Sequence, residues 1–172
     1  PNVIIVPVKV LNDKGYGSWS NVIKGIQWSI SETESGAGNK RILSMSLGGS
    51  QNKALDKVLS TIDDAIVVVA AGNGYGDDAC NYSPAGADAN NMVTVGSIDS
   101  DDHVSEFSSE GKCVDIMAPG GEIIAAGIKN PSSTDIMSGT SMATPHVAGI
   151  LAQIWQKMDS SSPEDVIQEL YD

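Results

Sequence analysis

The sequence predicts an α/β fold of three layers (αβα), in which helices cover both faces of a mainly parallel central sheet. Short apolar runs without alternation are typical of strands that are buried on both faces. Between these runs lie segments whose apolar residues recur at helical spacing. Strands and helices that alternate in this way build a parallel sheet. The chain has 172 residues, which suffice for one domain with a sizeable core.

The first half of the chain predicts three strands and two helices. The first apolar run is rich in β-branched residues and apolar on both faces, so we expect a central parallel strand there. Ser20 is a candidate cap for the helix that follows. The predicted elements are strands over residues 3–11, 41–47 and 65–71 and helices over residues 20–30 and 52–62.

The second half predicts a long loop, two shorter strands and two helices. Residues 74–91 are polar and rich in glycine, and loops of that length in a compact domain tend to be functional. Strands are expected over residues 92–98 and 113–117, and a strongly apolar helix over residues 141–157. Residues 162–165 have the composition of a further helix start.

The charge balance argues against two classes of partner. The formal net charge is −12 and no cluster of Lys and Arg occurs, so we expect no nucleic-acid partner. The longest apolar run, residues 65–71, is far shorter than the roughly 20 residues of a membrane helix, so we expect no membrane partner. The acidity fits an ordinary soluble surface and also allows a mild preference for cationic substrates. Because the chain opens on Pro1 without a leader, we expect its start to be processed or cut.

The segment SGTSMATPHVAG, residues 138–149, holds the candidate nucleophile Ser141. In the first turn of a helix the backbone N–H of Ser141 is unpaired, and the helix dipole favours negative charge there. Gly139 lets a substrate backbone approach closely. An isolated serine in this position would be only a helix cap. The whole segment, however, is similar to the nucleophile motif of the subtilases, the subtilisin-like serine peptidases.

Further segments resemble the same family in the same order, and the resemblance implies their roles. The run AAGN ends on Asn73, whose side-chain amide would be the second donor to an oxyanion beside the Ser141 N–H. An extended peptide would be held between residues 15–17 and 46–48, next to a pocket whose glycines and alanines suggest breadth with a lean toward apolar side chains. The residues implied in substrate binding are Gly15, Tyr16, Gly17, Ser46, Leu47, Gly48, Ala70, Ala71, Gly72, Tyr82, Gly139 and Thr140.

Two cysteines leave two interpretations open on composition alone. Cys80 and Cys113 are too few for a metal cage, and they are either buried thiols or one disulfide. Around Tyr82 the sequence is most similar to the proteinase K branch of the family. This resemblance implies that the two cysteines pair and that the Ser83–Pro84 bond is cis. A disulfide closing this loop should stabilise the fold by about 3–4 kcal/mol.

No cofactor is implied for the chemistry, but the resemblance implies a structural calcium. Asp115 resembles a calcium ligand of that branch, assisted by backbone carbonyls near Asn90 and Met92. One carboxylate with carbonyl oxygens suits calcium. A buried aspartate that caps a turn explains Asp115 equally well.

The aspartate and histidine motifs of the family do not occur in the sequence. His103 lies in a polar loop, and His146 points roughly 140° away from Ser141 on the same helix. We therefore expect residues 1–172 to be a partial subtilisin-like peptidase domain that lacks an N-terminal segment with the triad aspartate and histidine and a short C-terminal segment. Without a base the serine is a weak nucleophile, so the chain alone is predicted to be inactive.

The sequence thus predicts a serine endopeptidase that hydrolyses peptide bonds through an acyl-enzyme on Ser141. Its partners would be an extended peptide or protein substrate and a propeptide or the missing N-terminal part of the same domain, in a secreted or vacuolar location. The alternative is a degenerate peptidase that binds extended peptides without cutting them. Ser141 and Asn73 speak against that alternative, because a non-cutting protein needs neither.

Overall fold

A parallel sheet of four strands forms the centre of the protein. The computed structural model describes residues 3–31, 40–158 and 161–172. The strands are β1 (Arg41–Met45), β3 (Ala65–Ala70), β5 (Met92–Ile98) and β6 (Ile116–Pro119), in the order β1-β3-β5-β6. All three pairings are parallel, so the carboxyl ends of the strands meet at one edge of the sheet.

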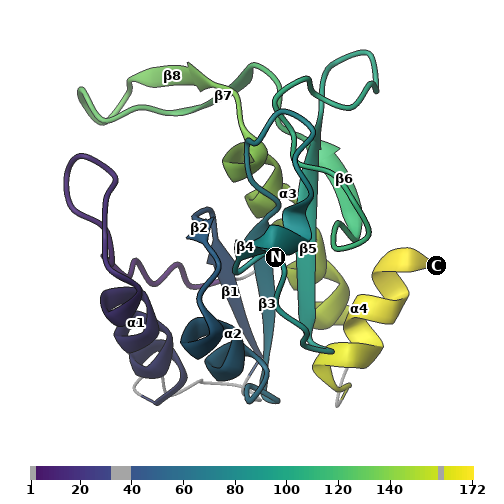
Figure 1. Ribbon diagram of the computed structural model, residues 1–172. Coiled ribbons are helices and arrows are strands. Elements are labelled where there is room, and N and C mark those ends of the chain that lie inside the picture. The colour runs from purple at the N-terminus through teal and green to yellow at the C-terminus, as the bar shows by residue number, and fades with distance from the viewer. Residues whose placement is uncertain (1–2, 32–39, 159–160) are drawn as a thin grey trace.

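Helices cover both faces of this sheet and make it the middle layer of three (Figure 1). Val67 and Val69 face α1 (Trp19–Ser31) and α2 (Lys53–Leu59). Their neighbours Ile66 and Val68 point to the other face, toward α3 (Thr140–Lys157) and α4 (Pro163–Tyr171). All six residues of β3 are buried, which is why its sequence is apolar without alternation. The predicted three-layer α/β class is confirmed.

The predicted helices form, but the first begins earlier than its predicted cap. Ser20 lies inside α1, and the Ser18 Oγ accepts from the Asn21 N–H at 3.2 Å instead. Asn52 caps α2 by accepting a hydrogen bond from the Leu55 N–H at 2.9 Å. Ser162 and Asp165 form a reciprocal capping box at the start of α4. None of the described helices has the length and apolar content needed to cross a membrane.

The strand predicted over residues 3–11 is wrong. Residues 3–10 have no strand structure, and Val3, Ile4 and Ile5 are exposed. A strand forms only against a neighbour that pairs with its backbone. Within the described ranges β1 pairs with β3 alone, so nothing adds residues 3–10 to the sheet.

Other differences concern short pairings. The strand expected over residues 113–117 begins only at Ile116, because the Val114 N–H closes a turn on the Gly111 carbonyl. Two small antiparallel pairs were not predicted. They are β2 (Gly49–Ser50) with β4 (Tyr82–Ser83), and β7 (Ile123–Ala126) with β8 (Thr134–Met137).

Candidate active site

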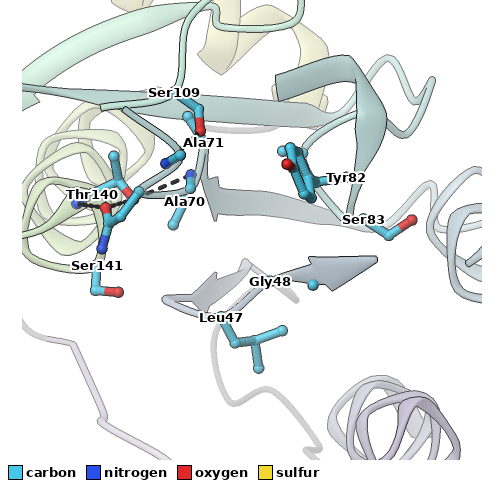
Figure 2. A pocket seen from close by; sticks show the side chains of 14 residues that line it. Leu47, Gly48, Ala70, Ala71, Tyr82, Ser83, Ser109, Thr140 and Ser141 are labelled. Atoms are coloured by element: carbon cyan, nitrogen blue, oxygen red, sulfur yellow. Dashed lines mark hydrogen bonds between the residues drawn. The ribbon is translucent and has the colours of Figure 1, made fainter. Parts of the chain in front are cut away.

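Three segments meet where β1 and β3 end and α3 begins. Residues 46–49 follow β1, residues 71–73 follow β3, and residues 139–141 open α3. Together they line a cavity of about 370 Å³. In Figure 2, Ser141 and Thr140 lie on one side of this cavity and Tyr82 on the other, with Ala70 and Ala71 between them. Its lining residues are Leu47, Gly48, Gly49, Ala70, Ala71, Gly72, Asn73, Gly74, Tyr82, Ser83, Ala85, Ser109, Thr140 and Ser141.

The Asn73 carboxamide is held in one orientation. Its Oδ1 accepts hydrogen bonds from the Thr140 N–H at 3.0 Å and from the Thr140 hydroxyl at 2.9 Å. Since the Thr140 N–H can only donate, the carboxamide atom that faces it must be the oxygen. The Thr140 Oγ1 in turn accepts from the Gly72 N–H at 3.2 Å. This network leaves Nδ2 of Asn73 pointing elsewhere, without an acceptor among the described residues.

Two nitrogen donors lie beside the space at Gly139. A side-chain carbon placed on Gly139 would lie 3.2 Å from Nδ2 of Asn73 and 3.7 Å from the backbone nitrogen of Ser141. The Ser141 N–H belongs to the first turn of α3 and has no acceptor in the described ranges, as the start of a helix requires. Two unpaired donors close to one point are suited to hold a single negatively charged oxygen.

Pro145 explains how Ser141 is tied to the end of β1. Pro145 lies within α3 and has no N–H, so the Ser141 carbonyl lacks its usual helical partner. The Ser46 hydroxyl donates to that carbonyl at 2.7 Å. In return, the Ser141 hydroxyl lies 3.4 Å from the Ser46 carbonyl, a long contact that leaves the hydroxyl available.

Neither histidine is placed to activate Ser141. His146 Nδ1 lies 2.8 Å from the Met142 carbonyl one turn before it, and the side chain is exposed. His103 is exposed in a loop, where Nδ1 lies 4.0 Å from Oδ2 of Asp99. In the described parts of the chain, the hydroxyl of Ser141 therefore has no basic partner.

A second cavity, of about 440 Å³, adjoins the first and shares Leu47, Gly48, Gly49 and Ser141 with it. Gly15, Tyr16 and Gly17 line its other side. These residues lie at the end of a turn in which the Asn12 N–H donates to the Tyr16 carbonyl at 2.8 Å. The sequence predicted that residues 15–17 and 46–48 face one groove, and the structure places both segments on this cavity.

A disulfide and a short strand pairing fix the loop that follows Asn73. Cys80 and Cys113 form the disulfide that the resemblance implied, 33 residues apart in the sequence. The Ser83–Pro84 bond is cis, as expected. Tyr82 and Ser83 form β4, which pairs with β2 and joins the loop to the Gly49 side of the cavity.

Asp115 lies at the start of β6, away from the two cavities. Its Oδ2 accepts from the Thr94 N–H at 2.7 Å, and burial raises the pKa of the carboxyl above its usual value despite that hydrogen bond. Oδ1 has no partner within the described ranges, and those ranges hold no cluster of three or more His, Cys, Asp or Glu side chains. A carboxylate oxygen without a partner is a donor of the type that calcium takes in proteins.

Comparison with known proteins shows the family of the chain. The model described as the subtilase family matches residues 1–171. The chain belongs to the subtilase family. This subtilase chain is 44% identical over 167 residues to subtilisin-like protease 2 of Pseudogymnoascus destructans, covering 96% of the chain and 40% of that relative. It is 44% identical over 166 residues to the alkaline serine exoprotease A of Vibrio alginolyticus, covering 96% of the chain and 30% of that protein.

A solved structure shares the fold of this subtilase chain. The crystal structure of a cold-adapted subtilisin-like serine proteinase aligns with a TM-score of 0.78 at 39% identity. The alignment covers 92% of this chain and 55% of that protein. The chain therefore spans about half of that structure and less than half of the curated relatives it matches.

Sequence reasoning did not single out Ser109 or one contact that holds the site together. Ser109 lines the first cavity and accepts from the Gly74 N–H at 3.1 Å, but it lies far along the chain in a polar loop that gives no signal. The tie between the Ser46 hydroxyl and the Ser141 carbonyl was also missed. A signal for it existed, since Pro145 in the predicted helix requires an outside donor for that carbonyl.

Proposed function

We propose that the chain is the nucleophile-bearing part of a serine endopeptidase that hydrolyses peptide bonds through an acyl-enzyme on Ser141. The observation that carries this proposal is that the Ser141 backbone nitrogen and Nδ2 of Asn73 both lie close to one point beside Gly139. Donors fixed in advance at the position of a developing charge supply a large share of the rate in acyl transfer. Thr140 supports the proposal, because it holds Asn73 in the required orientation.

In the proposed reaction the Ser141 Oγ attacks the carbonyl carbon of the peptide bond. The hydroxyl proton passes to a general base, and the carbonyl oxygen becomes an oxyanion that accepts hydrogen bonds from Ser141 N–H and Asn73 Nδ2. The C–N bond then breaks, the base returns its proton to the leaving amine, and water hydrolyses the ester by the same steps. Water thus supplies the hydroxyl of the new acid.

The base and its orienting carboxylate are proposed to come from outside residues 1–172. Both histidines of the chain lie away from the Ser141 hydroxyl, in contact with Met142 and Asp99 instead. The relatives named above are longer than the region they share with this chain, which leaves room for such a segment. We therefore expect residues 1–172 alone to show only residual hydrolysis.

The substrate is proposed to be an extended peptide or protein segment lying between residues 15–17 and 46–48. Gly17 and Gly48 make no backbone hydrogen bond to other described residues, so their N–H and C=O groups are available to pair with a peptide strand. The side chain before the cleaved bond would enter the cavity lined by Ala70, Ala71 and Tyr82. Affinity would come from the backbone and selectivity from the cavity.

We further propose secretion as the location and a structural calcium at Asp115. The Cys80–Cys113 disulfide is typical of proteins in oxidising compartments. One relative, from a Thermus strain, is named an extracellular serine proteinase. A vacuolar location, the other expectation from the sequence, has no support in the names of these relatives. The calcium would stabilise the fold and take no part in bond cleavage.

A fluorophosphonate probe tests the proposed function. The full gene product that contains residues 1–172 should be labelled on Ser141, and Ser141→Ala should abolish both labelling and hydrolysis. The isolated 172 residues should not be labelled at a comparable rate. Binding of extended peptides without labelling or cleavage by the full gene product would favour the non-cutting alternative.

A further inference from the structure

Asp77 places a carboxylate beside the cavity that is proposed to take the side chain before the cleaved bond. The Tyr82 hydroxyl donates a hydrogen bond to Oδ2 of Asp77 at 2.7 Å. The same oxygen would lie 3.1 Å from a side-chain carbon built on Gly74. Tyr82 and Gly74 both line the cavity, so the Asp77 carboxylate lies next to two of its lining residues, although Asp77 itself is not among them.

This carboxylate has no cationic partner. The ion pairs of the described residues join Lys9 to Asp13, Arg41 to Asp64 and His103 to Asp99, and none of them includes Asp77. Asp77 is exposed, and Tyr82 is the only side chain in the described ranges that hydrogen bonds to its carboxylate. A carboxylate offers about four acceptor positions, so most of its capacity stays free.

The hydrogen bond fixes the carboxylate relative to the cavity. Donation to Asp77 and the negative charge of its carboxylate raise the pKa of the Tyr82 hydroxyl, which keeps the hydroxyl protonated in its donor role. Two hydrogen bonds also hold the backbone of Asp77 in place. The Asp77 N–H donates to the Gly74 carbonyl at 3.2 Å, and the Asp77 carbonyl accepts from the Glu110 N–H at 3.0 Å.

We propose that Asp77 is a specificity-determining residue that makes this cavity favour peptides with arginine or lysine before the cleaved bond. The inference rests on the proposed function and names the substrate class of the same site. The apolar walls, with Ala70 and Ala71, accommodate the aliphatic part of a long cationic side chain. The charged end reaches the carboxylate of Asp77, which short or apolar side chains cannot use.

The rival explanation is that Asp77 only braces the loop through Tyr82. Asp77→Asn separates the two, because the asparagine carboxamide still accepts the Tyr82 hydrogen bond but carries no charge. Asp78→Asn is the matched control. It removes the same charge one residue away, where the Asp78 Oδ1 accepts from the Cys80 N–H at 3.0 Å instead of facing Tyr82.

The experiment compares kcat/KM for substrate pairs that differ in charge alone, using the full gene product. Arginine is compared with citrulline and lysine with norleucine, at the position before the cleaved bond. We expect the charged member to be preferred, and Asp77→Asn to lower each charged-to-neutral ratio about three- to fivefold, the upper end for an exposed ion pair. Asp78→Asn should change the ratios less than twofold, and added salt should lower the wild-type ratios.

The outcomes separate this inference from the proposed function. Hydrolysis of the neutral substrates with ratios that Asp77→Asn leaves unchanged would overturn the inference and leave the proposed function standing. An equal fall of the ratios in Asp78→Asn would also overturn it, because the preference would then come from the general acidity of the chain. Failure to hydrolyse any of the substrates would overturn both.

Discussion

The two sides of the candidate active site are built very differently. On the oxyanion side, Thr140 is 1% exposed and joins Asn73 and Gly72 in one hydrogen-bonded network above the packed end of β3. On the peptide side, Tyr16 is 73% exposed and its turn is closed mainly by Asn12. The chemistry needs donors fixed in position before the substrate arrives, whereas a backbone that pairs with a peptide can adjust to it.

The largest effect is expected at Asn73. Asn73→Ala removes one of the two convergent donors and should lower kcat by about 10²- to 10³-fold, with KM little changed, because the lost hydrogen bond strengthens only in the transition state. Steady-state kinetics of the full gene product measure this. Asn81→Ala, in the exposed part of the same loop, is the control. Equal losses in both variants would mean that the loop, and not the donor, is responsible.

Thr140 tests whether Asn73 must be held in place. Thr140→Val keeps the shape of the side chain but removes the hydroxyl that contacts Asn73 Oδ1 and leaves the Gly72 N–H without its acceptor. We expect a fall in kcat of about tenfold and a loss of stability of about 1–3 kcal/mol for the unsatisfied N–H. Thr140→Ser should restore kcat. A Val variant with unchanged kcat would show that Asn73 needs no such support.

Asp115 tests whether a bound metal stabilises the fold at a point away from the two cavities. In calcium, Asp115→Asn should lower the melting temperature by about 2–4 °C, the shift for roughly 1 kcal/mol in a domain of this size. In chelator the wild type should no longer have the higher melting temperature of the two proteins, because it then buries an uncompensated charge. Thermal unfolding of both proteins in calcium and in chelator gives the answer. Equal melting temperatures in calcium would exclude the site.

The pH dependence in chelator gives the same residue a second test. Burial raises the folded pKa of Asp115 above its unfolded value of about 3.8. The folded state therefore binds the proton more tightly, and the wild type should gain stability relative to Asp115→Asn as the pH falls from neutral toward 4. Urea unfolding at both pH values measures this. A relative loss toward pH 4 would contradict the assigned cause.

The smallest effect is expected on the peptide side. A side-chain carbon on Gly17 would lie 2.6 Å from the Val10 carbonyl oxygen, so Gly17→Ala must shift this segment. Because the segment is proposed to pair with extended peptides, kcat/KM should fall about three- to fivefold for a long peptide but not for a single-residue ester. Gly149→Ala, with open space around it on α3, is the control. Equal losses on both substrates would place the effect outside peptide pairing.

Local sequence patterns predicted most of the sheet and the helices. The elements that were predicted wrongly or missed depend on pairing between distant or exposed segments. The runs that became β3 and β5, and the caps of α2 and α4, are readable because period and capping chemistry lie within a few residues. Residues 3–11 have an equally strong strand composition, yet they form none, since a strand depends on its neighbour. The hairpin of β7 and β8 was missed because Ile124 and Ile136 are exposed and follow no buried pattern.

The site divides in the same way. The disulfide was predictable because the segments around it resemble the family, and the same resemblance singled out Ser141 and Asn73, whose proposed roles remain predictions. The contact of Asp77 with Tyr82 depends on how a glycine-rich loop turns, and glycine restricts its backbone least. Ser109 reaches the cavity only through the tertiary fold. The residues proposed to determine substrate specificity could therefore be found only in the structure, whereas the candidate nucleophile could be found in the sequence.

The structure of a boronate adduct tests the central claim most directly. A peptidyl boronic acid with alanine at the boron-bearing position should bond to the Ser141 Oγ of the full gene product. One boronate oxygen should then lie about 2.7–3.1 Å from both the Ser141 backbone nitrogen and Nδ2 of Asn73, the distances of an oxyanion site. A boronate bonded to another residue, or an adduct whose oxygens all face solvent away from Asn73, would contradict the proposed site.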